Sequence, residues 1–290
     1  MSWFKKLLCK LFHIGCSQPP TPPPSTTPCR PDLLFGYYGT QLGQATATKD
    51  HVNITHIGSW GDWSTATGRA FLLDLIIDQA HQAVNHGITR LMFTLDWCLL
   101  QPTSPRTLLS EAQAVTFLQT FTARLVAEGL SAYTHAFYVV DEPNIPEVAL
   151  SEADMITTNT LIRAFMAGGP FDGIPLVTTY GTGNTARPGI HSFNWVGIDN
   201  YGANVTTNGQ YAALVSQLMS GQRTILLPGG SNPWREDPLT YYDYAQTDTR
   251  VAMIMPFMWF SATNGSDAIN HNGMAPQYQA VGQRVKGTTP

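Results

Sequence analysis

From residue 31 onward, short apolar runs alternate with amphipathic segments, and no other feature of the chain constrains its fold as strongly. Eight runs have strand length and are rich in β-branched and aromatic residues: 33–38, 52–57, 90–95, 132–140, 176–180, 195–198, 224–227 and 251–259. Helical periodicity occurs between them at residues 71–85, 110–128, 151–166 and 211–219. This alternation predicts an α/β fold, a single (β/α)8 (TIM) barrel over residues 31–290.

Length and turn chemistry favour the barrel over other α/β folds. The chain has 290 residues, of which 43% are hydrophobic and 12% charged, and a single barrel takes about 250 residues. A doubly wound sheet is the alternative. The segment after the first strand-like run, from Gly36 to Gly39, lacks the glycine spacing that a dinucleotide site requires. We therefore expect neither a nucleotide nor any other cofactor.

Residues 1–30 form a separate leader. Its apolar residues recur at helical spacing on one face, and they are Trp3, Phe4, Leu7, Leu8, Leu11 and Phe12. With lysines on the other faces, this pattern predicts a short basic amphipathic helix at a membrane surface through residues 1–16, or a poor secretory signal interrupted by Lys10. Residues 13–16 resemble a bacterial lipoprotein cleavage box ending at Cys16, and the prolines of residues 18–31 predict an extended tether. We expect a secreted or membrane-anchored protein outside the cytoplasm, the alternative being an unremarkable disordered leader.

Charge and motifs exclude several classes of protein. The leader holds four of the 16 basic residues and no acid, so the rest of the chain has 12 basic and 20 acidic residues, which argues against nucleic acid as a partner. Cys98 is the only cysteine of that part, which leaves no disulfide framework and no zinc spacing. Neither a His-x-His metal motif in the first strand-like run nor the Gly-x-Ser-x-Gly motif of serine hydrolases occurs. We expect no bound metal.

The fourth strand-like run ends in two adjacent carboxylates. The apolar residues from Ala136 to Val140 predict a strand buried on both faces, and Asp141, Glu142 and Pro143 follow at once. In parallel α/β folds, the chemistry is built at the carboxyl ends of the strands. Two neighbouring carboxylates there tend to acquire separate pKa values, which acid/base chemistry near neutrality requires. The alternative is structural, with Asp141 capping a turn and Glu142 in solvent.

Polar and aromatic residues follow the other strand-like runs as well. We predict that the substrate is bound by Tyr37, Trp60, Asp62, Asp96, Trp97, Asn144, Tyr180, Tyr201, Trp234 and Trp259. Asp199 and Tyr201 follow the sixth run and share one parity, which puts them on one face of the strand. Carboxylates combined with flat aromatic faces at so many strand ends are typical of a carbohydrate site.

The fourth and eighth runs resemble motifs of glycoside hydrolases that have a barrel fold. The Asp-Glu-Pro sequence is similar to the fourth-strand Asn-Glu-Pro of clan A, and Trp259 is similar to that clan's eighth-strand tryptophan under the bound sugar. The resemblance covers the body of the chain and implies that Glu142 is the general acid/base. Two positions depart from the pattern, because Asp141 stands where clan A has Asn and the seventh run lacks the nucleophilic glutamate.

Asp141 and Glu142 also resemble the fourth-strand pair of the hexosaminidases of families 20 and 123. In those enzymes the substrate's acetamido oxygen attacks the anomeric carbon, an aspartate orients the acetamido group and a glutamate protonates the leaving oxygen. That resemblance implies that Asp141 orients an acetamido group, with Tyr201 as its partner. The other interpretation takes a nucleophile or base from another loop, and its candidates are, in order, Asp199, Asp96 and Glu236.

These patterns predict a monomeric glycosidase acting on a poly- or oligosaccharide, with Glu142, Asp141 and Asp199 as its catalytic residues. A non-catalytic, surface-tethered carbohydrate-binding barrel is the alternative, because an inactivated hydrolase would also lack the seventh-strand glutamate. The adjacent buried carboxylates favour the enzyme, since they are hard to explain in a pure binding module.

Overall fold

The computed structural model describes residues 30–39, 43–58, 61, 63–182, 185–202, 204–205, 209–259 and 268–288. The predicted amphipathic helix and cleavage box lie outside these residues, as do most of the tether, Trp60 and Asp62. Within the described ranges, no helix combines the length and the apolar character needed to cross a membrane.

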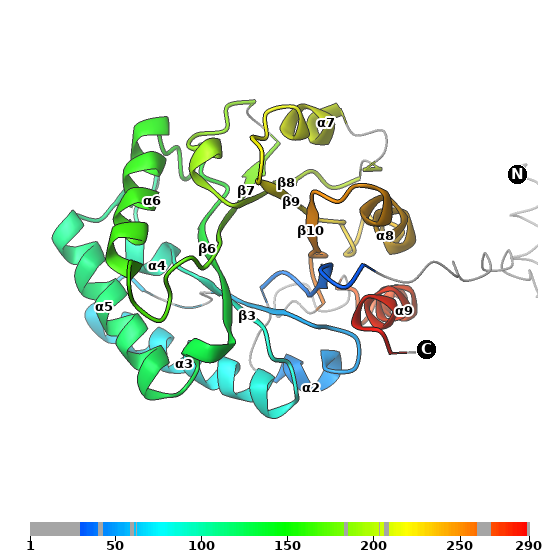
Figure 1. Ribbon diagram of the computed structural model, residues 1–290, viewed down its shortest axis with the longest axis horizontal. Coiled ribbons are helices and arrows are strands. Elements are labelled where there is room, and N and C mark those ends of the chain that lie inside the picture. Colours follow the sequence, from blue (N-terminus) through cyan, green and yellow to red (C-terminus); the bar gives the residue numbers. More distant parts are fainter. Residues whose placement is uncertain are drawn as a thin grey trace, which may run out of the picture.

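Eight parallel strands form one sheet in the order β1-β10-β9-β8-β7-β6-β3-β2 (Figure 1). They are β1 (Leu34–Phe35), β2 (Thr55–Ile57), β3 (Leu91–Thr94), β6 (Thr134–Asp141), β7 (Leu176–Gly181), β8 (Trp195–Asp199), β9 (Arg223–Leu226) and β10 (Val251–Ile254). Each strand overlaps one of the predicted strand-like runs, and neighbours in the sheet follow the chain around a ring. The predicted (β/α)8 barrel is confirmed.

The ring closes where β1 meets the residues that lead into β2. The backbone N–H of Asn53 donates to the Phe35 carbonyl oxygen at 3.1 Å, and the Asn53 side chain accepts from the Phe35 N–H at 2.8 Å. At Gly36 an added Cβ would lie 2.2 Å from the backbone oxygen of Ile54. Only glycine therefore permits this close approach of the two backbones.

The helices surround the sheet (Figure 1). Four of them, α3 (Ala66–Asn85), α5 (Glu111–Ala127), α6 (Glu152–Met166) and α7 (Gly209–Val215), match the predicted helical segments. Ser110 and Ser151 form capping boxes at the starts of α5 and α6, which fixes where these helices begin. Elements that the periodicity did not predict are α2 (Gln44–Thr48), α4 (Asp96–Leu99), α8 (Pro238–Thr247), α9 (Ala275–Lys286), the hairpin β4 (Leu100–Gln101) and β5 (Thr107–Leu108), and the 3₁₀ turns Ser131–Tyr133 and Ile190–Ser192.

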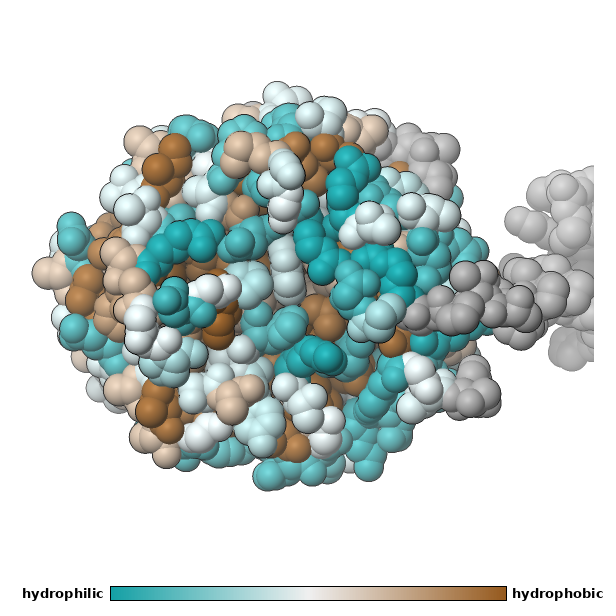
Figure 2. Space-filling view, in the orientation of Figure 1, coloured by the Kyte–Doolittle hydropathy of each residue, from teal (hydrophilic) through white to brown (hydrophobic). Residues whose placement is uncertain are grey.

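Two apolar clusters hold the fold together. The first fills the barrel and draws on every strand or its flanking residue: Leu34, Ile54, Met92, Ala136, Tyr138, Val177, Trp195, Ile225, Leu227, Ala252, Met253 and Met255. The second and larger cluster lies between the sheet and the helices. On the face of the molecule in Figure 2, hydrophobic residues occur in small, separate patches among hydrophilic ones. Burial in these two layers is the main source of stability.

Candidate active site

Asp141 points into the barrel because β6 is irregular just before it. Ala136 and Tyr138 belong to the interior cluster, whereas Val139 and Val140 both belong to the outer one. The register between β6 and β7 shifts between Tyr138 and Val140, so the alternation of faces is interrupted there. The next residue, Asp141, consequently faces the interior, where its side chain bonds to Tyr138.

Three hydroxyl groups hold the Asp141 carboxylate. Tyr38 donates to Oδ2 at 2.5 Å, while Tyr138 and Thr179 donate to Oδ1 at 2.6 and 3.2 Å. The Tyr138 and Thr179 hydroxyl oxygens also lie within hydrogen-bond distance of each other, so their two protons serve the three contacts of this triangle. These donors come from β6, β7 and the segment just after β1, so the barrel itself fixes the orientation of the Asp141 carboxyl group.

A buried histidine supports Tyr38 from below. The His56 ring lies 4.9 Å from the Tyr38 ring, its Nδ1 accepts from the Gly39 N–H at 3.0 Å, and its Nε2 lies 2.8 Å from Thr94 Oγ1. Burial lowers the pKa of His56 to about 3, so the imidazole is neutral at physiological pH. The accepting Nδ1 leaves the proton on Nε2, which donates to Thr94. His56 is thus a neutral packing residue beneath the site.

Glu142 turns back over the end of the barrel. Its backbone has a φ of 45°, a left-handed conformation that costs a non-glycine residue roughly 1–3 kcal/mol, and its N–H donates to the Thr179 carbonyl at 3.1 Å. The carboxyl group lies above Gly181, where an added Cβ would be 2.7 Å from Glu142 Oε1. Among the described residues, none hydrogen-bonds to this carboxyl group.

The environment of Glu142 keeps its carboxyl group partly protonated near neutrality. Burial is the main cause, and the negative charges of Asp141 and Glu147 add to it, so that the pKa rises to about 7. A carboxylic acid with this pKa gives up a proton readily at physiological pH and takes it back again. This is the property required of a general acid/base.

Asp199 lies next to Glu142, and Gly181 is the residue between them. In the register of β7 and β8, Asp199 pairs with Gly181, the residue beneath the Glu142 carboxyl group. Paired residues of parallel strands point to the same face of the sheet, so Asp199 projects toward the space that Gly181 leaves open. The pKa of Asp199 is raised mainly by burial, and the charges of Glu142 and Asp141 raise it further. Three carboxyl groups therefore share one end of the barrel.

Two buried oxygen atoms at this place lack partners. Asp199 Oδ1 and the Tyr201 hydroxyl oxygen are both shielded from solvent and hydrogen-bonded to no described residue. Their mutual geometry falls short of a hydrogen bond, although the Tyr201 hydroxyl lies close enough to oppose the rise in the pKa of Asp199. These two oxygen atoms are therefore at most weakly paired with each other, which leaves both able to form a better hydrogen bond with a ligand.

Aromatic rings line one side of the carboxylates. Tyr201 stacks on Phe257 with ring centroids 5.2 Å apart and planes 25° apart, and Trp234 lies 4.6 Å from Tyr201 on its other side. Phe257 also contacts Tyr38 at 5.7 Å. The rings form a continuous wall from the exposed Trp234 to the tyrosine that holds Asp141. Phe257 and Tyr38 were not among the predicted substrate-binding residues, although each flanks or neighbours one in the sequence.

Several predicted substrate-binding residues lie elsewhere. Tyr37 and Trp259 pack against each other at 5.0 Å in the cluster between sheet and helices, and the Tyr37 hydroxyl lies 3.0 Å from His51 Nε2. Tyr180 is completely buried and donates to the Pro188 carbonyl at 2.9 Å. These three aromatic residues contribute to packing, and the eighth-strand ring beside the carboxylates is Phe257 rather than Trp259.

The residues predicted after the third strand both belong to α4. Asp96 begins α4, accepts from the Trp97 N–H at 2.8 Å and lies 3.7 Å from the guanidinium of Arg106. The Trp97 ring is 2% exposed and contacts Phe121 of α5 at 5.6 Å. Asp96 is thus the first residue of α4, and its charge contributes to the raised pKa of Tyr38, whereas Trp97 joins that helix to the outer layer.

The side chains of Asn144 and Glu236 both form hydrogen bonds that hold backbone segments in place. The Asn144 side chain accepts from the N–H of Gly181 at 2.9 Å and donates to its carbonyl at 2.7 Å, which holds the turn after Glu142 against β7. Glu236 accepts from the Gly229 N–H and, at 2.9 Å, from the Tyr241 hydroxyl. With both carboxylate oxygens engaged, Glu236 anchors the loop after β9 and is poorly placed to be a second catalytic carboxylate.

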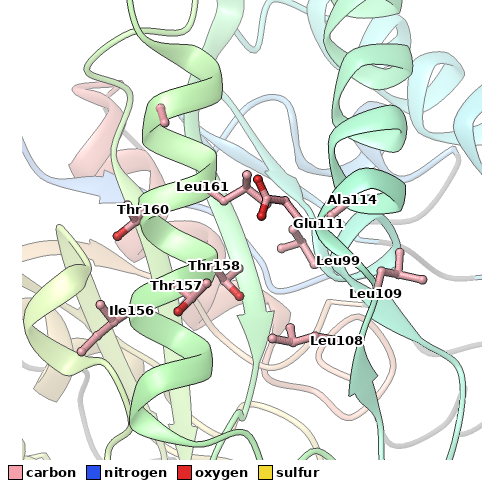
Figure 3. Close-up of a pocket in the computed structure, with 11 residues that line it drawn as sticks. Leu99, Leu108, Leu109, Glu111, Ala114, Ile156, Thr157, Thr158, Thr160 and Leu161 are labelled. Carbon is pink, nitrogen blue, oxygen red and sulfur yellow. The ribbon is translucent and has the colours of Figure 1, made fainter.

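The molecule also has an apolar cavity away from these carboxylates. It has a volume of about 420 Å³ and lies between α5, α6 and the β4–β5 hairpin, where Leu99, Leu108, Leu109 and Leu161 converge (Figure 3). Its lining contains one carboxylate, Glu111, and the hydroxyl groups of Thr157, Thr158 and Thr160, with no histidine, lysine or cysteine. Within the described ranges, no cluster of three or more His, Cys, Asp or Glu side chains could hold a metal ion.

No protein-family model and no curated protein matches the sequence. Solved structures match in three dimensions. A family 30 subfamily 8 xylanase from Clostridium acetobutylicum has a TM-score of 0.57 at 12% identity, over 87% of this chain and 71% of that one. A β-mannanase from Thermomonospora fusca has a TM-score of 0.56 at 13% identity, over 89% and 92% of the two chains. A β-1,3-glucanosyltransferase from Rhizomucor miehei has a TM-score of 0.50 at 10% identity, over 80% and 88%. At these identities the likeness is one of fold, and the chain has the (β/α)8 barrel found in these carbohydrate-active enzymes.

Proposed function

We propose that the protein is a glycoside hydrolase in which Glu142 is the general acid/base. The observation that carries the proposal is the carboxyl group of Glu142, with a pKa of about 7 at the carboxyl end of a barrel strand and with no hydrogen bond to any described residue. A carboxyl group that is merely structural would be paired, as those of Asp96 and Glu236 are. The barrel is shared with solved glycoside hydrolases, which supports the reaction class without assigning a substrate.

In this mechanism the protonated Glu142 delivers its proton to the glycosidic oxygen as the bond to the anomeric carbon breaks. Asp141 acts through its charge, since it keeps the pKa of Glu142 high and is itself fixed by Tyr38, Tyr138 and Thr179. The leaving sugar departs as an alcohol. If the product retains its configuration, the deprotonated Glu142 takes a proton from the attacking water; if the product is inverted, Asp199 takes that proton and Glu142 is reprotonated from solvent.

Asp199 is the second carboxyl group of the proposed reaction. Its Oδ1 has no partner among the described residues, whereas both oxygens of Asp141 already accept hydrogen bonds. That difference favours Asp199 over Asp141 as the group that meets the substrate. Either role requires the ionised form of Asp199, which burial and the charges of Glu142 and Asp141 disfavour and the Tyr201 hydroxyl favours. The ionised Asp199 attacks the anomeric carbon if the product retains its configuration and activates a water molecule if the product is inverted. The anomer formed first, followed by NMR, distinguishes the two routes.

Replacing Glu142 with Gln tests the assignment, because Gln keeps the shape and removes the titrating proton. We expect turnover of oligosaccharides to fall by about 10² to 10⁴ while binding persists. In the parent, activity should decline as the pH rises through about 7, since the protonated acid is lost there, and the variant should lack this decline. Glu111→Gln is the matched control, because Glu111 is exposed at the start of α5, does not contribute to the raised pKa of Glu142 and should leave turnover nearly unchanged. Equal turnover in parent and Glu142→Gln would contradict the proposal and favour the carbohydrate-binding barrel.

A further inference from the structure

Trp234 is the exposed tryptophan of the described chain. The other four described tryptophans are at most 8% exposed, whereas Trp234 is 39% exposed. Its ring lies 4.6 Å from that of Tyr201, the residue whose buried hydroxyl adjoins Asp199. One side chain thus separates this indole from the catalytic carboxyl groups. An apolar ring left in solvent beside a site calls for an explanation, because burial of such a ring would stabilise the fold.

Glu236 and its partners hold the loop that carries Trp234. Glu236 accepts from the Gly229 N–H and the Tyr241 hydroxyl, and the Glu236 carbonyl accepts from the Tyr278 hydroxyl at 2.9 Å. On the far side, Asn272 donates to the Gly230 carbonyl at 2.8 Å. Bonds from α8, α9 and the segment before α9 therefore fix both ends of the loop. Such anchoring is expected where a side chain has to keep its position without being buried.

Two glycines make room for the indole. An added Cβ at Gly229 would lie 3.0 Å from the Cβ atoms of both Trp234 and Tyr201, and one at Gly202 would lie 3.1 Å from Trp234 Cδ1. The indole accordingly rests on backbone and on the Tyr201 ring at the same time. Its position is set by close packing on one side, and its exposed part remains free for a ligand.

We infer that Trp234 is a platform for a second sugar ring, so that the preferred substrate is a chain of sugars rather than a single glycoside. This inference rests on the proposed function. A pyranose presents a flat face of C–H groups, and a fixed indole offers a matching apolar surface with a polar N–H at its edge. The aromatic wall of Trp234, Tyr201 and Phe257 leads from this platform to Asp199 and Glu142, in the direction that a chain would take.

The test compares chain lengths in Trp234→Ala and in the parent. Laminari-, manno- and xylo-oligosaccharides of two to six sugars, together with the aryl monosaccharides, are the probes. For the series that the parent cleaves, KM for the longer members should rise about ten-fold in Trp234→Ala, while kcat/KM for the aryl monosaccharide stays within about two-fold. Trp234→Phe should recover part of the loss. Phe71→Ala is the control, because Phe71 is 68% exposed on α3 and contacts none of these residues.

Binding separates this inference from the proposed function. Calorimetry with Glu142→Gln and with the double variant Glu142→Gln, Trp234→Ala measures affinity without turnover. If the parent hydrolyses none of the probes while affinity for them depends on Trp234, the platform is supported and the proposed hydrolase is overturned. Hydrolysis with the same dependence on chain length in parent and Trp234→Ala would overturn the platform alone. If none of the three oligosaccharide series binds, the platform is overturned as well.

Discussion

At the scale of single residues, Asp141 and Asp199 differ in what their carboxyl oxygens contact. Asp141 accepts from Tyr38, Tyr138 and Thr179, whereas Asp199 Oδ1 has no partner among the described residues. The sequence predicts both carboxylates, because each directly follows a strand-like run. The sequence does not predict which carboxylate accepts hydrogen bonds from hydroxyl groups of the barrel. The answer depends on the register shift in β6 that turns Asp141 inward.

The two aspartates give opposite expectations for their amide variants. If Asp199 acts on the anomeric carbon or on water, Asp199→Asn should lower kcat by at least about 10² on sugars with or without an acetamido group. Asp141→Asn removes the charge that raises the pKa of Glu142, so the decline of activity at alkaline pH should move to lower pH. Initial rates from pH 4 to 9 on paired glucosides and 2-acetamido glucosides measure both effects. Turnover restricted to acetamido sugars, with Asp141→Asn the more damaging change, would restore the substrate-assisted route.

At the scale of secondary structure, the sequence predicts the long and regular elements and misses the short ones. All eight strands and four helices follow from periodicity, because buried strands select β-branched residues and helices select an apolar stripe. The five-residue α2 and the four-residue α4 are too short to have a period. The sequence does not predict which aromatic ring after β10 faces the carboxylates. Trp259 and Phe257 follow a second register shift, in the pairing of β10 with β9, so the packing of the rings decides their positions.

The end of β7 gives a prediction at this scale. Gly181→Ala would put a Cβ 2.5 Å from Ile145 Cγ2 and 2.7 Å from Glu142 Oε1, in the space between Glu142 and Asp199. Because the clashing atoms are the ends of side chains, we expect the barrel to fold with a loss of roughly 1–3 kcal/mol while the carboxyl group is displaced. Turnover should fall by about 10². Gly209→Ala, with no atom within 4 Å of its added Cβ, is the matched control. Wild-type kcat in Gly181→Ala would contradict this placement of Glu142.

At the scale of the whole molecule, the leader joins the barrel on the face opposite the candidate site. Arg30 donates to the carbonyl oxygens of Ala245, Asp248, Thr249 and Val251, and it pairs with Asp32 at 2.9 Å. Val251 begins β10, so these bonds lie at the amino ends of the strands, whereas Glu142 and Asp199 lie at the carboxyl ends.

Membrane attachment through the leader is a proposal that deletion tests. Residues 1–29 include Lys5, Lys6 and Lys10 beside six apolar residues at helical spacing, a composition suited to anionic lipid surfaces. A chain that begins at Arg30 should keep the melting temperature and turnover of the full chain and should lose sedimentation with phosphatidylserine vesicles. Arg30→Ala in the full chain should lower the melting temperature and keep sedimentation with the vesicles. The substitution removes the bonds that fix β1 beside β10 and leaves the leader intact. Sedimentation that survives the deletion would transfer the lipid-binding role to the barrel.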